Sequence, residues 1–209
     1  MNTTLIHNNK ELILAARDLF MRIGLRSVSM DDIARELGIS KKTLYQTVQN
    51  KEELIDLVLQ LIVDEDRLIL QEHQRQASDA IEEMLLNSRH FIHQMRQVSP
   101  TTLHDLRKYY PELFRGRVAA HQQEFMASLQ RNLERGIREG VYRPEIDPVV
   151  VANLYVGMTM LVVDRGIFPA RERPLSEILM QHNTYHFNGI ANQAGRDRLR
   201  AHLDRFELC

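Results

Sequence analysis

The sequence predicts an all-α fold, on three observations. Good helix formers such as Leu, Ala, Glu, Gln and Arg recur throughout, and only 6 prolines and 9 glycines interrupt the 209 residues. Hydrophobic residues make up 44% of the chain, which is enough for a sizeable core. These apolar residues recur at the spacing of helices that are buried on one face.

The first helix is expected over residues 8–23. Leu12, Ala16 and Ile23 fall on one helical face. Gly24 stands where a left-handed C-terminal cap is favourable, so the helix should end just before it.

Two very short helices are expected next. Ser29-Met30-Asp31-Asp32 has the form of a capping box, in which the first and last side chains each accept a hydrogen bond from the other's backbone N–H. It predicts a helix over residues 32–37, which Gly38 stops. Ser40 is expected to cap a second helix over residues 41–47.

Longer helices should fill the rest of the chain. One is expected from Lys51 through Ile62, with Asn50 as its cap. Tyr109-Tyr110-Pro111 should end or kink a later helix, because proline removes a backbone donor. The later helices are expected over residues 81–98, 102–114, 117–139, 148–165, 175–192 and 196–206.

Two short helices joined by a turn of about three residues have the spacing of a DNA-reading helix-turn-helix. The wedge between them should be apolar, with Ala34 at the close crossing; it consists of Ile33, Leu37, Ile39 and Leu44. The outward side of the second helix carries groups suited to phosphates and base edges, namely Lys41, Lys42, Thr43, Tyr45 and Gln46. Because the net charge is only -1, DNA binding must rest on this local set.

The first 60 or so residues resemble the N-terminal domain of TetR-family regulators. The matching segments are Ile13-Leu14-x-Ala16-x-x-Leu19-Phe20-x-x-x-Gly24, Met30-x-Asp32-Ile33-Ala34-x-x-Leu37-Gly38-Ile39-Ser40, Thr43-Leu44-Tyr45 and Asn50-Lys51-Glu52-Glu53-Leu54. The chain departs from the family at Thr47-Val48, where an aromatic residue or histidine followed by phenylalanine is usual. We expect a DNA-binding domain over residues 6–66, with its motif at about 29–48, and an effector-binding and dimerisation domain over residues 67–209.

The resemblance implies a ligand-responsive regulator, a repressor that binds a palindromic operator in double-stranded DNA as a homodimer and is released by a small molecule. No cofactor is expected. Thr43, Tyr45 and Lys51 would hold backbone phosphates, and Lys41, Lys42 and Gln46 would lie over the major groove. Ser29, Ser40 and Thr47 complete the expected DNA-binding set.

The homodimer is expected to form through two apolar late helices, residues 149–165 and 175–192. Together with their copies they would make a four-helix interface. Burial inside one monomer is the alternative.

Aromatic and methionine side chains could line an effector pocket, since both suit adaptable apolar sites. The expected set is Phe91, Met95, Tyr109, Tyr110, Phe114, Phe125 and Met158. Membership of an ordinary core is the alternative for each of them.

Two histidine pairs, His90 with His93 and His182 with His186, stand about one helical turn apart and could each supply two metal ligands. No cysteine or carboxylate trio completes a site, so no metal is expected. We expect solvated or interface histidines.

Other classes of protein receive little support. An enzyme is not expected, because the sequence has no phosphate loop, no nucleotide-binding glycine pattern and no nucleophile with a partner; Cys209, the single cysteine, is at the extreme C-terminus. A helical interaction protein that has lost DNA binding is the second alternative. Without a secretory signal or an apolar stretch long enough to span a bilayer, the protein is expected in the cytoplasm.

Overall fold

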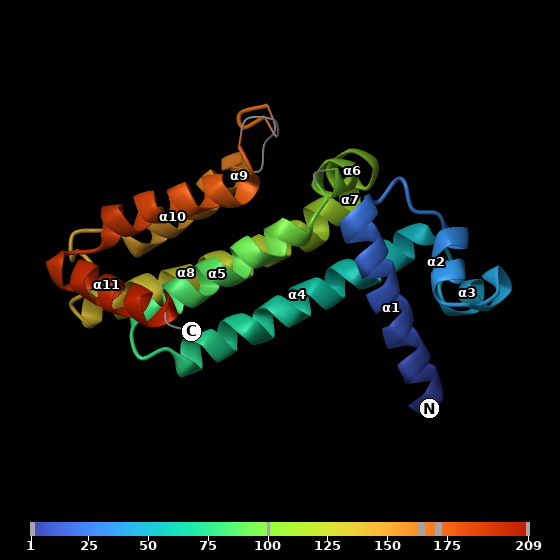
Figure 1. Cartoon of the computed structure of the whole chain (residues 1–209), viewed down its shortest axis with the longest axis horizontal. Helices are drawn as coiled ribbons and strands as arrows, with labels where there is room; N and C mark the ends of the chain where they lie inside the picture. The colour runs from blue at the N-terminus through green and yellow to red at the C-terminus, as the bar shows by residue number, and fades with distance from the viewer. Residues whose placement is uncertain (1–2, 100, 163–165, 170–172, 208–209) are drawn as a thin grey trace. The chain divides into compact units, whose positions relative to one another are not determined.

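A computed structural model gives the fold, and it describes residues 3–99, 101–162, 166–169 and 173–207. Within these ranges the chain is helical, apart from connecting segments and one isolated bridge between Tyr142 and Ala191, which confirms the all-α prediction (Figure 1). The helices are α1 Thr3–Ile23, α2 Met30–Glu36, α3 Lys41–Thr47, α4 Lys51–Gln76, α5 Ala80–Gln97, α6 Thr102–Tyr109, α7 Pro111–Leu113, α8 Ala119–Arg138, α9 Pro148–Val162, α10 Leu175–Ile190 and α11 Gln193–Glu207, with a π-helix at Phe114–Val118. Cys209 and residues 163–165 of the expected dimer helix lie outside the described residues.

The predicted caps at the starts of the short helices are confirmed. Ser29 and Asp32 form a complete capping box before α2. Ser40 Oγ accepts from the Thr43 backbone N–H at 3.0 Å before α3. Asn50 Oδ1 accepts from the Glu53 N–H at 2.9 Å and so begins α4. Local side-chain capping therefore sets where these helices start.

The predicted break near Gly116 is wrong. α6 ends at Tyr109, α7 begins at Pro111, and the π-helix then carries the chain through Gly116 into α8. Proline cannot continue a helix at its own position because it lacks the N–H, whereas a single glycine inside a helix is tolerated.

The chain divides into two compact units. The first comprises residues 1–66 and 97–121, and the second comprises residues 67–96 and 122–209. Helix α6 belongs to the first unit and is held there by specific contacts. The Thr102 hydroxyl donates to the Phe20 carbonyl oxygen at 3.0 Å, and Asp105 accepts from the Arg26 backbone N–H at 3.0 Å.

The first unit is built around one hydrophobic core. Phe20, Ile33, Leu44 and Leu54 are fully buried in it, and Leu106 of α6 completes it. The core thus holds α1 to α4 together, so that each of the two short helices is fixed by its buried residues.

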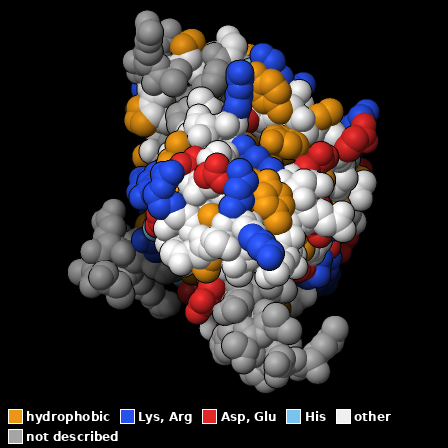
Figure 2. Space-filling view, turned by 90° about the vertical axis from the view of Figure 1, so that its right-hand side faces the viewer, with side chains coloured by type: hydrophobic (Ala, Val, Ile, Leu, Met, Phe, Trp, Pro, Cys, Tyr) orange, Lys and Arg blue, Asp and Glu red, His pale blue; other side chains and the backbone are white. Residues whose placement is uncertain are grey.

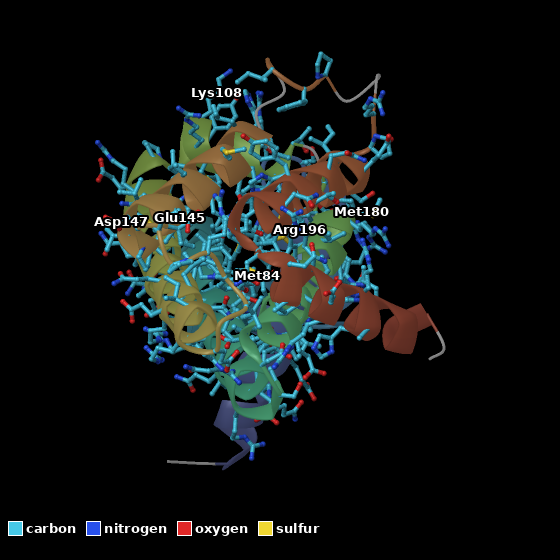
Figure 3. The ribbon with its side chains drawn as sticks, turned by 90° about the vertical axis from the view of Figure 1, so that its left-hand side faces the viewer. Met84, Lys108, Glu145, Asp147, Met180 and Arg196 are labelled. Carbon is cyan, nitrogen blue, oxygen red and sulfur yellow. The ribbon has the colours of Figure 1, made fainter. Side chains whose placement is uncertain are left out.

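The second unit contains two hydrophobic clusters. The larger includes Met84 of α5, which Figure 3 labels, together with Leu133, Tyr142 and Phe187. The smaller is centred on Leu179 of α10. None of the helices in the described part of the chain is both long and apolar enough to cross a membrane.

Candidate DNA-binding interface

The connection between α2 and α3 has the backbone geometry of a tight turn. Gly38 adopts a φ of +64°, which side chains other than glycine rarely adopt. The Ile39 N–H donates to the Ala34 carbonyl oxygen at 3.0 Å, which closes the turn. Leu37 and Ile39 pack against the core of the first unit.

Helix α3 buries one side chain, Leu44, and exposes the others. Tyr45 retains 44% of its accessible surface. The remaining exposed residues are Lys41, Lys42, Thr43, Gln46 and Thr47. Val48, at the position where phenylalanine is usual in TetR-family regulators, is buried in the core. The arrangement leaves one face of α3 free to enter a groove of the size of the DNA major groove.

Charge on this side of the molecule is mixed. Figure 2, which views the molecule from the side on which α2 and α3 lie in Figure 1, shows Lys and Arg side chains interspersed with Asp and Glu. Lys41 Nζ lies 2.9 Å from Asp31 Oδ1, and this hydrogen bond raises the pKa of Lys41. Both side chains are exposed, so the pair is weak. A phosphate oxygen can therefore replace the aspartate.

The expected contact residues Ser29 and Ser40 already act as helix caps. Ser29 Oγ donates to Asp32 Oδ2 at 2.6 Å, and the side-chain and backbone hydrogen bonds from Ser29 hold the pKa of the Asp32 carboxyl below its usual value. Ser40 Oγ lies 2.8 Å from Thr43 Oγ1. Each hydroxyl is bound within the protein, yet both serines are on the surface.

Lys51 differs from the other expected contacts because it is half-buried. Its ammonium group lies 5.9 Å from the centre of the Phe20 ring, at the start of α4. Burial lowers the pKa of Lys51, while the carboxylates of Asp105 and Asp32 oppose that shift. The aliphatic stem covers apolar surface and leaves a fixed ammonium group near the end of the motif.

The seven residues expected to line an effector pocket fall into both units. Tyr110 and Phe114 pack against the core of the first unit, and Tyr109 is 41% exposed. The other four, which belong to the second unit, are Phe91, Met95, Phe125 and Met158. Phe91 and Met95 join the smaller cluster, and Phe125 joins the larger one. Their role in binding an effector stays a prediction.

The expectation of solvated or interface histidines is wrong for one pair. His182 and His186 are buried, at 6% and 9% exposure, among residues of their own chain. Burial is possible because α10 packs against α9, where the Tyr155 ring lies 4.7 Å from the His182 ring and 4.5 Å from the His186 ring. Of the other pair, His90 is half-buried and His93 is exposed. The described residues contain no group of three or more His, Cys, Asp or Glu that could hold a metal ion.

Sequence reasoning missed the polar residues around this histidine pair, Ser88, Tyr155, Thr159 and Asn183. The Tyr155 hydroxyl donates to Asn183 Oδ1 at 2.7 Å, and all four residues are buried. Polar residues at helical spacing inside otherwise apolar helices were the available signal. The sequence alone did not show that they meet.

Comparison with known proteins relates the N-terminal segment to a family. Residues 12–58 match the family described as bacterial regulatory proteins, tetR family. YhgD of Bacillus subtilis, described as an uncharacterized HTH-type transcriptional regulator, is 24% identical over 164 residues, which are 72% of this chain and 82% of that protein. The HTH-type transcriptional activator FasR of Mycolicibacterium smegmatis is 43% identical over 54 residues, which are 26% of this chain and 25% of that protein.

The fold extends the similarity beyond the matched segment. A crystal structure of a TetR-family transcriptional regulator from Agrobacterium tumefaciens superposes with a TM-score of 0.74 and 18% identity, covering 90% of this chain and 100% of that chain. The matched residues 12–58 contain the whole of α2, the turn and α3. The N-terminal segment therefore matches the tetR family of bacterial regulatory proteins, and the described chain has the same fold as a TetR-family transcriptional regulator.

Proposed function

We propose that the protein is a repressor that binds a palindromic operator as a homodimer and is released by a small-molecule effector. The observation that carries the proposal is the exposed polar face of α3, held in place by the buried Leu44. Lys42, Tyr45 and Gln46 on that face supply one cation, one phenol and one amide to a single DNA half-site.

Roles within the interface follow from chemistry. Phosphate contacts set the position of the protein on DNA, whereas base-edge contacts select the sequence. Thr43, Tyr45 and the fixed ammonium of Lys51 are assigned to phosphates. Gln46 is assigned to base edges, because its amide both donates and accepts. Lys41 and Lys42 lie over the groove, and Ser29, Ser40 and Thr47 border the contact.

The homodimer is proposed to form through α9 and α10. Several large apolar side chains on these helices are exposed: Val149, Val150, Leu154 and Leu161 on α9, and Met180 and Tyr185 on α10, with exposed fractions from 47% to 70%. Val150, Leu154, Gly157 and Leu161 follow one helical stripe, and a β carbon added at Gly157 would meet nothing within 4 Å. A second copy of this chain is the partner that such a self-complementary apolar surface fits.

Regulation requires that the effector and DNA favour different conformations. α4 belongs to both units, since the boundary between them falls after Asp66 within this helix. It is the proposed link between the DNA-binding unit and the effector-binding unit. Repression is the simpler mode, because a dimer that covers its operator excludes other proteins without a further contact. We place this activity in the cytoplasm.

The test is selection of bound sequences from a random duplex pool by the purified full-length protein at two salt concentrations. We expect a palindromic consensus and a steep loss of affinity with salt. Lys51→Ala should reduce the log-log salt slope by about 2, because a dimer loses two phosphate contacts. Lys108→Ala, which removes an exposed lysine from α6, is the matched control and should leave the slope unchanged. Failure to enrich any sequence would reject the proposal in favour of an interaction protein.

A further inference from the structure

A buried polar layer lies inside the second unit. It consists of Ser88 on α5, Tyr155 and Thr159 on α9, and His182 and His186 on α10, each at most 9% exposed. The layer separates the two hydrophobic clusters on the same three helices. Ile81 and Met84 precede Ser88 on α5 in the larger cluster, and Phe91 and Met95 follow it in the smaller.

The same order holds on the other two helices. On α9, Ala152 belongs to the larger cluster and Val162 to the smaller, with Thr159 between them. On α10, Ile178 belongs to the smaller cluster and Ile190 to the larger. The two histidines lie between these residues along the helix. Three helices therefore place polar side chains at one level of an otherwise apolar core.

Two ring nitrogens in this layer have no hydrogen-bond partner, His182 Nδ1 and His186 Nε2. The hydrogen of the Thr159 hydroxyl is used, because that group donates to the Tyr155 carbonyl oxygen at 2.9 Å. His182 Nε2, which lies 3.3 Å from Thr159 Oγ1, must then be the donor in that contact. In the neutral ring this leaves His182 Nδ1 as a buried acceptor that needs a donor.

Unpartnered groups of this kind destabilise a core. A buried polar atom without a partner has lost its hydrogen bonds to water and gained none, whereas an apolar ring of the same size would pack without that penalty. Burial lowers the pKa of both histidines, so both rings are neutral near neutral pH. The layer itself contains no carboxylate, ammonium or guanidinium group. Its chemistry therefore suits a neutral partner that donates hydrogen bonds.

We propose that this layer is the polar end of the effector site, and that the effector is a small neutral ring compound bearing a hydroxyl group. The hydroxyl would donate to His182 Nδ1 and lie within reach of His186 Nε2 or Ser88 Oγ. The ring would lie against Tyr155 and the apolar side chains of the smaller cluster, which include two residues predicted from sequence, Phe91 and Met95. This inference rests on the proposed effector-regulated function and gives the effector a chemical class.

The first experiment compares phenol with toluene, which has a methyl group in place of the hydroxyl. Binding to the full-length protein without DNA is measured by calorimetry and by changes in the histidine ring carbon signals in NMR. We expect phenol to bind at least tenfold more tightly than toluene and to shift the His182 and His186 signals. Equal affinities, or no binding of phenol, would overturn the inference.

Variants locate the site. His182→Phe should abolish the preference for phenol over toluene, whereas His104→Phe, the same change at an exposed histidine of α6, should preserve it. His186→Phe should keep or raise the melting temperature of the ligand-free protein, because it replaces an unpartnered polar ring by an apolar one. A marked decrease in melting temperature would show that His186 serves packing alone, which contradicts a ligand role.

The two proposals fail in different ways. If phenol binds through His182 but leaves operator affinity unchanged, the site stands and the proposed release from DNA fails for this class of compound. If operator binding is intact and phenol does not bind, the site fails and the DNA-binding function stands.

Discussion

The ring of Tyr142 leaves no room for a β carbon at position 136. An ideal β carbon on Gly136 would lie 2.1 Å from Tyr142 Cδ2, and the Tyr142 hydroxyl is itself held by the Ala80 carbonyl oxygen and by Asn132 Oδ1, each at 3.1 Å. The ring therefore cannot move aside. The glycine is required by packing and not by backbone conformation, since Gly136 is a helical residue.

Gly136→Ala should destabilise the protein by about 1–3 kcal/mol, the usual cost of overpacking a core. Urea unfolding of the full chain measures this. Gly116→Ala is the control, because a β carbon there meets nothing within 4 Å, and it should cost little or stabilise the helix slightly. Equal effects of the two substitutions would contradict the packing argument.

The buried histidines predict how stability depends on pH. Burial, together with repulsion from His182, lowers the pKa of His186 to about 4 from the usual 6.5. The unfolded chain therefore binds more protons than the folded one between these two pH values. The free energy of unfolding that depends on a neutral His186 is therefore fully present above pH 6.5 and is lost as pH falls toward 4. Between pH 7 and pH 5 the loss from His186 should be about 2 kcal/mol.

The measurement is the free energy of unfolding in urea at these two pH values. His186→Phe should remove most of this loss, and His104→Phe should not change it. An unchanged pH dependence in His186→Phe would show that His186 titrates normally in the folded protein.

Single residues were predictable from sequence where their role depends on neighbours along the chain. The caps at Ser29 and Ser40 follow from rules that span three or four positions. The burial of His182 and His186 depends on Tyr155, which is 27 residues or more away, so local spacing could not reveal it. Similarly, nothing local indicated that Lys51 would lie beside Phe20.

Among the helices, α3 is the element whose integrity matters most for the proposed activity. It has only 7 residues, Lys41–Thr47, so it is too short to be stable by itself. Its order depends on the buried Leu44 and on the Ser40 cap. Loss of either contact should expose the α3 backbone to solvent.

Ser40→Ala should increase the hydrogen exchange rates of α3 amides roughly fivefold, because the loss of an N-cap costs about 1 kcal/mol. Exchange measured by NMR or mass spectrometry on the full chain reports this locally. Ser27→Ala, at an exposed serine in the segment before α2, should leave α3 unchanged. Unchanged α3 exchange in Ser40→Ala would mean that Leu44 alone holds the helix.

Helix boundaries were predictable where proline or a cap marks them and not elsewhere. The break at Tyr110-Pro111 was expected, whereas the expected break at Gly116 is absent. A glycine marks a helix end only when the backbone there adopts positive φ, as at Gly24 and Gly140. At Gly116 the surrounding helix continues, and sequence alone does not distinguish the two cases.

At the scale of the whole molecule, the proposed dimer makes a direct prediction. Leu154→Asp places a charge on the exposed apolar stripe of α9, so the protein should become monomeric and lose most of its operator affinity. Sedimentation equilibrium and a DNA titration measure the two effects. Leu68→Asp is a matched control on α4, where the leucine is 65% exposed against 59% for Leu154. A Leu154→Asp variant that remains dimeric would exclude α9 from the interface.

The grouping of residues 97–121 with the first unit affects how this protein can be recombined. The chain passes from one unit to the other at three peptide bonds, after residues 66, 96 and 121. A fragment that ends at residue 66 would lack Leu106, which completes the core around Phe20, and Thr102, which binds the Phe20 carbonyl group. A hybrid regulator made by transplanting that fragment alone onto another sensor would therefore carry an incomplete DNA-binding unit, and the functional graft must include the discontinuous segment as well.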